Sequence, residues 1–338
     1  MDWEEVRRTA KERFKGACRV CRVCNGMACA GEMPGMGGVG TGSSFTANVE
    51  ALAGYKIVLR TLHDVSAPQT QIELFGHTLS SPVLGAPVAG TKLNMNEAIP
   101  EPDLAHALIA GCAAAGTVGM IGDGPDPTLY PTGLEVIAAQ GGTGIAIIKP
   151  RLEEDIIARI RQAEEAGAWA VGVDIDAAGI IGMVRAGQPV GPHPPDMWER
   201  IIAETELPFI LKGIMTPDEA EIAIDIGAAA IVVSNHGGRI LDHTPGTAEV
   251  LPDIADIVNG EIVLLADGGV RSGSDVLKML ALGADAVLVG RPLAIAAVGG
   301  GAEAVADLLN RYTDELRAAM ILTGTAAVDE VDESVLYL

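Results

Sequence analysis

Aromatic side chains are scarce in this sequence. Among 338 residues there are three tryptophans, four tyrosines and four phenylalanines, whereas glycine occurs 42 times and 49% of all residues are hydrophobic. Small apolar residues allow helices to pack closely on strands that are buried on both faces. The composition therefore favours a buried parallel sheet covered by helices.

Positive charge is also in short supply. The 23 lysines and arginines face 45 aspartates and glutamates, and the net charge is −22. Such a chain is repelled by nucleic acid and by anionic membrane surfaces, so we expect neither as a partner. An anionic substrate has to be attracted by local cations instead.

Apolar runs of membrane-spanning length and a leader pattern are missing as well. We find no run that approaches the roughly 20 apolar residues of a membrane span. The first residues, Met-Asp-Trp-Glu-Glu, do not match a signal peptide. We therefore expect a cytoplasmic protein, in which disulfide bonds are disfavoured.

Apolar strands alternate with helical stretches from residue 82 onward, for example helices over 153–166, 217–226 and 273–282. This rhythm predicts a (β/α)8 TIM barrel over 82–338 that ends in a helix over 301–323. Residues 1–81 form an N-terminal extension. The predicted strands are 82–88, 116–121, 143–148, 168–174, 208–213, 228–234, 261–266 and 285–289.

The extension holds four of the five cysteines, at Cys18, Cys21, Cys24 and Cys29. A helix with a basic face is predicted over 4–17, just before them. Their spacing approaches an iron–sulfur run, although the last gap is longer and no proline follows. Zinc and simple packing at a helix end are the alternatives. The glycine-rich stretch over 31–44 lacks the lysine of a P-loop, so we interpret it as a connector or lid. A helix over 48–55 follows.

In a barrel, chemistry gathers at the carboxyl ends of the strands. Here these ends carry Asp174, Lys212 and the polar stretch Ser-Asn-His-Gly-Gly-Arg over 234–239. The last two strands end in Asp-Gly-Gly-Val-Arg over 267–271 and Gly-Arg over 290–291. Backbone amides, a helix N-terminus and arginines there predict a phosphate site. A purely structural role is the alternative for each of these residues. The glycines would then only form tight turns, Lys212 would only pair with Asp174, and His236 would occupy a core position.

Four stretches carry a specific resemblance: Ile-Leu-Lys-Gly-Ile over 210–214, the polar stretch over 234–239, Asp-Gly-Gly-Val-Arg over 267–271, and Ala-Leu-Gly-Ala-Asp-Ala-Val-Leu-Val-Gly-Arg-Pro over 281–292. In these stretches the chain resembles the FMN-dependent α-hydroxy acid oxidase and dehydrogenase family, which includes glycolate oxidase and lactate oxidase. The resemblance implies oxidation of a small, lactate-like 2-hydroxy acid to the 2-oxo acid. It also implies a homo-oligomer, a tetramer by analogy.

The resemblance assigns roles residue by residue. His236 resembles the active-site base, Arg239 the clamp for the substrate carboxylate, and Asp174 the acid that orients the histidine. Lys212 resembles the cation beside the flavin. The remaining FMN-binding positions implied by the resemblance are Pro87, Val88, Ala89, Ser234, Asp267, Gly268, Gly269, Arg271, Gly290 and Arg291.

The chain departs from the family where substrate contacts are usual. Family members place a tyrosine in the N-terminal region and another on the third barrel strand, but that strand here reads Gly-Ile-Ala-Ile-Ile-Lys over 144–149. Lys149 and the cysteine- and glycine-rich segment are candidates to fill this gap. An isopentenyl diphosphate type of flavin isomerase and a flavin-binding protein without turnover remain alternatives. The electron acceptor, whether oxygen, a quinone or a protein, is open.

Overall fold

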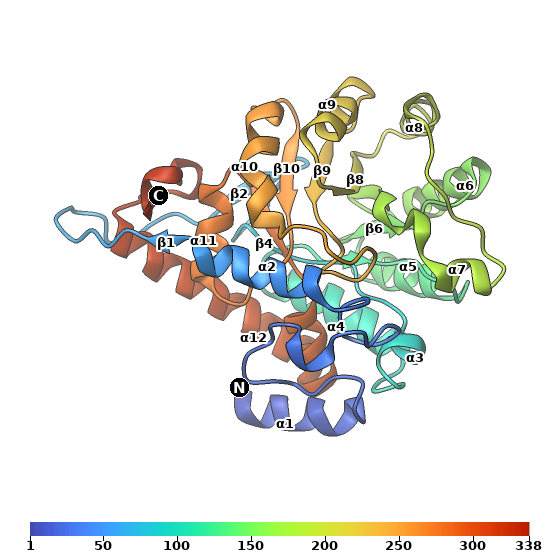
Figure 1. Ribbon diagram of the computed structural model, residues 1–338, viewed down its shortest axis with the longest axis horizontal. Coiled ribbons are helices and arrows are strands. Elements are labelled where there is room, and N and C mark those ends of the chain that lie inside the picture. Colours follow the sequence, from blue (N-terminus) through green and yellow to red (C-terminus); the bar gives the residue numbers. More distant parts are fainter. Residues whose placement is uncertain (338) are drawn as a thin grey trace.

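Eight parallel strands form the centre of the structure, a computed structural model that describes residues 1–337 (Figure 1). Their order is β4-β11-β10-β9-β8-β7-β6-β5, and a bridge between Gly85 and Gly119 closes the ring. Each strand overlaps a predicted segment, which confirms the (β/α)8 barrel. The strands are β4 (Val83–Gly85), β5 (Met120–Ile121), β6 (Ile145–Ile148), β7 (Ala170–Asp174), β8 (Phe209–Ile214), β9 (Ala230–Val233), β10 (Val263–Ala266) and β11 (Ala286–Val289).

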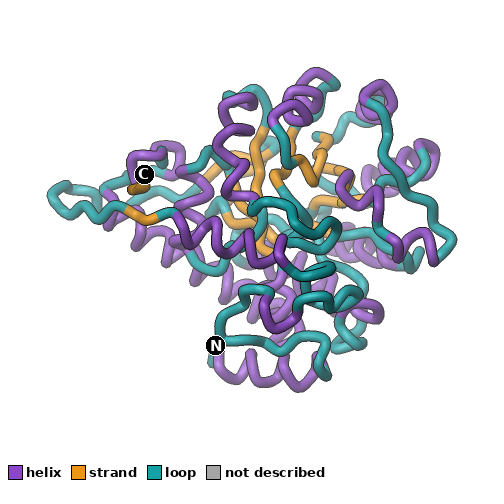
Figure 2. Tube along the Cα trace, viewed as in Figure 1, coloured by secondary structure: helices purple, strands orange, loops and turns teal. Residues whose placement is uncertain are grey.

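Helices surround this barrel, and the strands gather inside them in Figure 2. Two short antiparallel sheets lie outside the ring: β1 (Lys56–Ile57) with β12 (Leu336–Tyr337), and the hairpin of β2 (Ile72–Leu74) and β3 (His77–Leu79). The helices are α1 (Trp3–Phe14), α2 (Ser43–Gly54), α3 (Thr91–Asn94), α4 (Glu101–Ala114), α5 (Leu129–Ala139), α6 (Glu153–Glu165), α7 (Ile181–Arg185), α8 (Pro195–Ile202), α9 (Pro217–Asp225), α10 (Thr247–Val258), α11 (Gly273–Ala281) and α12 (Arg291–Thr323).

The barrel strands are buried on both faces, as their continuous apolar runs predict. In β9, Ala230 and Val232 belong to the cluster that fills the barrel interior. Their neighbours Ile231 and Val233 belong to the larger cluster between the barrel and the helices. Because successive side chains of a strand point to opposite faces, each strand contributes to both cores.

α12 is longer than the predicted helix over 301–323. It begins at Arg291 and is broken at Gly300 and Gly301, which leave helical geometry. By length and composition it could cross a membrane, contrary to our reading of the sequence, with a mean hydropathy of 1.4 over its most apolar window. In the structure 61% of that window is buried, and α12 packs against α4, α1 and α11. Its apolarity is explained by packing.

The N-terminal helix α1 ends earlier than predicted. Lys15 follows Phe14 in the left-handed conformation, with φ of 48°, and terminates the helix before the cysteines. Among the described residues, the only helical piece in the cysteine segment is a short 3-10 turn over Met27–Cys29. The alternative in which three cysteines pack along one helix end is therefore wrong.

The glycine-rich segment lies across the carboxyl ends of the barrel strands. The backbone N–H of Val39 donates to the carbonyl of Gly238, which follows β9. α2 then starts at Ser43, earlier than predicted, and buries Phe45 and Asn48 against the barrel. The segment therefore forms part of the wall around the ends of the strands.

Candidate active site

A cavity of about 1090 Å3 opens at the carboxyl ends of the barrel strands. Its wall contains His236, Arg239 and Asp174, and every predicted FMN-binding residue except Ser234. The predicted site residues come from β4, β7, β8, β9, β10 and β11 and the loops after them. The barrel thus brings together side chains that are far apart in the sequence.

His236 stands on a sharply turned loop directly after β9. His236, Gly237 and Gly238 have successive φ values of 58°, 64° and 74°, so a non-glycine residue occupies the left-handed region at the site. Both glycines are closely packed. A Cβ on Gly237 would press on the Arg291 guanidinium, and one on Gly238 would collide with the backbone of Phe45. They allow the loop to pack against its neighbours.

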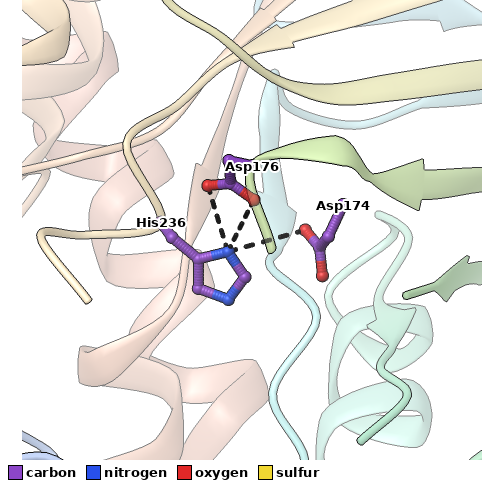
Figure 3. A group of neighbouring side chains, drawn as sticks. All are labelled: Asp174, Asp176 and His236. Atoms are coloured by element: carbon purple, nitrogen blue, oxygen red, sulfur yellow. Dashed lines mark hydrogen bonds and ion pairs between the residues drawn. The ribbon is translucent and has the colours of Figure 1, made fainter. Parts of the chain in front are cut away.

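Two carboxylates face Nδ1 of His236, as Figure 3 shows. The Asp176 Oδ1 atom lies 3.0 Å from Nδ1, and the Asp174 Oδ1 atom lies 3.9 Å away. Asp174 ends β7, and Asp176 lies in the 3-10 turn over Ile175–Gly179. The predicted partner Asp174 is therefore the more distant of the two. With Nδ1 engaged, Nε2 is the ring nitrogen left to exchange a proton with a substrate.

These three side chains also bring one metal-ligand atom each within 4.8 Å of one another. A cation there would meet two ammonium groups that already neutralise Asp174, those of Lys149 and Lys212. Like charges in a buried site repel strongly. The arrangement therefore suits proton chemistry better than metal binding.

Asp174 is buried and held by two lysines. Lys149 Nζ lies 2.7 Å from Oδ2 and Lys212 Nζ lies 3.2 Å from Oδ1. Burial alone would raise the pKa of Asp174, but the charges of Lys149, Lys212 and His236 outweigh it and hold that pKa below its usual range. The Asp174 carboxylate is thus a fixed negative charge at the base of the site.

Lys212 forms the pairing with Asp174 that the sequence left as an alternative. It lines the cavity, and it also pairs with Asp174 and with Asp267, whose Oδ2 atom is 3.4 Å from Nζ. Ser234 accepts a hydrogen bond from Lys212 and donates one of 2.8 Å to Asp267. Burial would lower the pKa of Lys212, but these carboxylates raise it above the usual value. Lys212 therefore presents a permanent positive charge to the cavity.

Arg239 points into the glycine-rich segment. Its guanidinium donates to the carbonyls of Gly35 and Gly37, at 2.5 Å and 3.4 Å, and to Oδ1 of Asn94 at 3.1 Å. Burial lowers the pKa of Arg239 to about 10. A guanidinium has more N–H donors than these three bonds use, so it can also hold a carboxylate.

Arg291 and Arg271 meet at the predicted phosphate site. Arg291 donates to the carbonyls of Met36, Gly37 and Gly237, and its guanidinium lies 3.7 Å from the ring centre of Phe45. Burial, followed by the charges of Arg239 and Arg271, lowers the pKa of Arg291 to about 9. Buried cations that repel one another, beside the N-terminus of α12, suit a phosphate group. The donor set thus fits FMN.

The sequence missed several residues that shape this site. Asp176 was given no role, although its position two residues after Asp174 was an available signal. Asn48, which donates to Oδ1 of Asn235 at 2.8 Å, and Phe45 line the cavity from α2. Asp123 is buried and accepts two hydrogen bonds from Arg151, which fixes the loop after β5.

Comparison with protein families gives one match that covers most of the chain. A family described as "FMN-dependent dehydrogenase" matches residues 35–188 and 191–338. A 4-hydroxymandelate oxidase of Amycolatopsis orientalis is 36% identical and covers 86% of this chain and 89% of its own length. An L-lactate oxidase of Alicycliphilus denitrificans is 34% identical and covers 89% of this chain and 90% of its own length.

Solved structures resemble the chain over nearly its whole length. Mandelate oxidase with (S)-2-phenylpropionate has a TM-score of 0.79 and 34% identity, and it covers 99% of this chain and 97% of its own. Mandelate oxidase with 3,3-difluoro-2-hydroxy-3-phenylpropionic acid gives the same values. The likeness extends from the barrel to the N-terminal extension.

Proposed function

We propose, because this chain belongs to the FMN-dependent dehydrogenase family, that it oxidises a small, lactate-like 2-hydroxy acid to the 2-oxo acid. Oxidation of a 2-hydroxy acid with FMN as cofactor follows from the family match and from relatives named as oxidases and dehydrogenases. These relatives favour an oxidoreductase over the isomerase and over a protein without turnover. The substrate and the roles of the individual residues are our proposal.

The observation that supports the proposal most is the place of His236. Its Nδ1 atom faces the Asp176 carboxylate, so Nε2 is available to take the hydroxyl proton of a substrate in the cavity. Asp176 and Asp174 favour the protonated imidazole that results, because both are negative and close to it. His236 is thus proposed as the catalytic base.

FMN supplies the acceptor for the two electrons of the substrate. On this chain, Arg271 and Arg291 would hold its phosphate group, and the backbone of residues 87–89 would lie along its ring. Lys212 would stabilise the negative charge that the reduced cofactor carries, since its own charge is permanent.

Arg239 is proposed to bind the substrate carboxylate. It lines the cavity together with His236 and belongs to the same loop after β9. The Gly35 carbonyl and Asn94 fix the plane of its guanidinium, which orients the remaining donors. A carboxylate held in this way is placed for reaction without a further loss of freedom.

An aromatic substrate is the second candidate. Relatives and solved structures named for mandelate and 4-hydroxymandelate align along almost the whole chain. A lactate-like substrate is supported by the L-lactate oxidase, which aligns about as far. It is also supported by L-lactate dehydrogenases that are 51–54% identical over 123–129 residues, 36–38% of this chain and 32–34% of their own length. Only a direct comparison of substrates separates the two.

Anaerobic mixing of the FMN-loaded protein with lactate, glycolate, mandelate and 4-hydroxymandelate tests the proposal. We expect lactate to bleach the oxidised flavin spectrum with the highest kcat/KM. A preference for mandelate would replace the lactate-like assignment, and no bleaching by any of the acids would refute the activity.

The variant His236→Ala tests the base. It should bind FMN normally but reduce it at least about 100-fold more slowly, which is the usual contribution of a positioned base. His106→Ala, on the exposed face of α4, serves as the matched control and should react at the normal rate. A normal rate in His236→Ala would remove His236 from the mechanism.

A further inference from the structure

Four cysteines line a second cavity, behind the wall of the active site. The wall of this cavity includes Cys18, Cys21, Cys24 and Cys29, all with free thiols. The family match begins at residue 35, after all four of them. Four thiols around one space require their own explanation.

The chain holds the cysteine segment in a fixed and strained shape. Arg7 from α1 donates to the carbonyls of Val20 and Cys21, at 2.9 Å and 2.8 Å, and Arg19 forms two bonds of 2.6 Å with Glu32. Val20 has a φ of 48°, which a β-branched residue rarely adopts. Strain of this kind collects at functional sites.

The backbone of Val20 also contacts a sulfur atom. The N–H of Val20 donates to Sγ of Cys18 at 3.4 Å. Arg271, from the active-site cavity, contacts Cys24, with Nη2 3.7 Å from its Sγ and Nε 3.3 Å from its carbonyl oxygen. N–H groups that contact the cysteine sulfurs are among the features that set the potential of iron–sulfur sites.

The sulfur atoms are not arranged as a single zinc ion would require. Zinc bound by four thiolates places its sulfur ligands roughly 3.8 Å apart. Among the described residues, no three cysteine sulfurs lie within 4.8 Å of one another. A four-iron cluster binds each thiolate at a different corner, so its ligands stand farther apart. The sequence gaps, two, two and four residues, also resemble those of iron–sulfur sites.

The charges around the cavity are complementary to an anionic cluster. Arg291 lines both this cavity and the active-site cavity, and Arg271 reaches from the latter to Cys24. Arg7, Arg19 and Arg22 belong to or contact the cysteine segment itself. This concentration of arginines stands out in a chain with a net charge of −22.

We propose that Cys18, Cys21, Cys24 and Cys29 hold a [4Fe–4S] cluster beside the flavin site. Its role rests on the function proposed above. Oxidation of one 2-hydroxy acid yields two electrons and two protons. The electrons would pass from the flavin through the cluster, one at a time, to two molecules of a one-electron acceptor protein, and the protons would go to the solvent.

Anaerobic reconstitution with ferrous iron and sulfide, followed by analysis of the bound metal, tests the site. We expect about four irons and four sulfides per chain and an EPR signal of the reduced cluster after dithionite. Zinc as the bound metal, a disulfide among these cysteines, or no bound iron would each overturn the proposal. None of these results depends on activity with a 2-hydroxy acid.

Single substitutions identify the ligands. Cys24→Ser should lose most of the iron, whereas Cys112→Ala, at a buried cysteine of α4 outside the segment, should retain it. FMN binding and the far-UV circular dichroism of Cys24→Ser show whether the fold survives. A folded Cys24→Ser protein with full iron content would refute its role as a ligand.

The relay has a separate test. After anaerobic addition of the preferred 2-hydroxy acid, without dithionite, the EPR signal of the reduced cluster should appear as the flavin is bleached. A bleached flavin beside a cluster that stays oxidised would overturn the relay and leave the cluster site in place. A flavin that is not bleached would instead refute the proposed function.

Discussion

Lys149 and Asp174 form a buried ion pair of 2.7 Å at the ends of neighbouring strands. β6 and β7 are paired in register up to Ile148 and Val173, so the next residues of the two strands lie side by side. Lys149 follows the strand on which relatives usually carry a tyrosine, and it was one of two candidates to fill that gap near the substrate. In the structure Lys149 lines the cavity and neutralises the Asp174 carboxylate.

The substitution Lys149→Met should destabilise the fold at neutral pH. Removing one partner of a buried ion pair costs about 3–5 kcal/mol, and we expect about 1–3 kcal/mol here because Lys212 still pairs with Asp174. Urea unfolding at pH 7 measures the loss. Lys11→Met, on the exposed face of α1, is the control and should stay close to the wild type.

The stability lost in Lys149→Met should become smaller as the pH falls. The native pKa of Asp174 lies below its usual value of 3.8, so its pairing stabilises the fold above that pH and the contribution disappears as the pH falls through the native pKa. Lys149→Met raises that native pKa. The difference from the wild type should therefore shrink below about pH 4. A difference that grows on acidification would contradict the assignment.

The substitution Asp176→Asn should slow flavin reduction by about 100-fold with little effect on FMN binding. Asp176 is the nearer carboxylate to His236, and an amide can present its NH2 group to Nδ1 and so favour the wrong tautomer. Stopped-flow reduction by the preferred substrate measures the effect. An exposed acid of the same kind, Asp196 on α8, gives the control Asp196→Asn. A rate equal to that of the wild type would show that Asp174 alone orients the base.

The substitution Arg271→Met should weaken FMN binding but not riboflavin binding. If Arg271 contacts the phosphate, its loss removes charged hydrogen bonds of about 1.5–3 kcal/mol, which corresponds to about 10- to 100-fold in Kd. Riboflavin lacks the phosphate and should bind both proteins equally. Quenching of flavin fluorescence measures both affinities, with the exposed Arg311→Met as control. Equal losses for the two flavins would place the phosphate elsewhere.

The barrel could be predicted because its signal is local. Eight apolar runs, each with buried side chains on both faces, alternate with amphipathic helices, and each run became a strand. The convergence of Asp174, Lys212 and His236 followed from the same rule, since parallel strands end at one rim. Sequence motifs at those strand ends indicated that the cofactor is FMN.

The contacts between the extension and the rim could not be predicted in this way. Arg239 and Arg291 use many of their donors on carbonyls of residues 35–37, which lie more than two hundred residues away in the sequence. Backbone carbonyls are present in every residue, so nothing in the pattern marks the ones that will accept these bonds. The choice of Asp176 over Asp174 likewise depends on the 3-10 turn after β7, which has no strong signal of its own.

Two glycines with similar φ values allow the cost of backbone strain to be told apart from the cost of a steric clash. Gly227, before β9, and Gly238, after it, have φ values of 85° and 74°. A Cβ at Gly227 would meet no atom within 4 Å, whereas one at Gly238 would meet the backbone of Phe45. Gly227→Ala should therefore cost only the left-handed strain, about 1–2 kcal/mol. Gly238→Ala should cost a further 1–3 kcal/mol or so, because α2 must move.

Urea unfolding of both variants measures this difference in stability. FMN affinity then shows whether the clash also disturbs the active site. A displaced α2 carries Phe45 and Asn48 away from the cavity, so Gly238→Ala should also bind FMN more weakly, while Gly227→Ala should bind it normally. If both variants lose the same stability and keep the same affinity, the glycine serves backbone geometry alone. The contrast expected here would instead mean that the loop bearing His236 and the N-terminal extension are shaped by one another, so that neither part of the active site forms without the other.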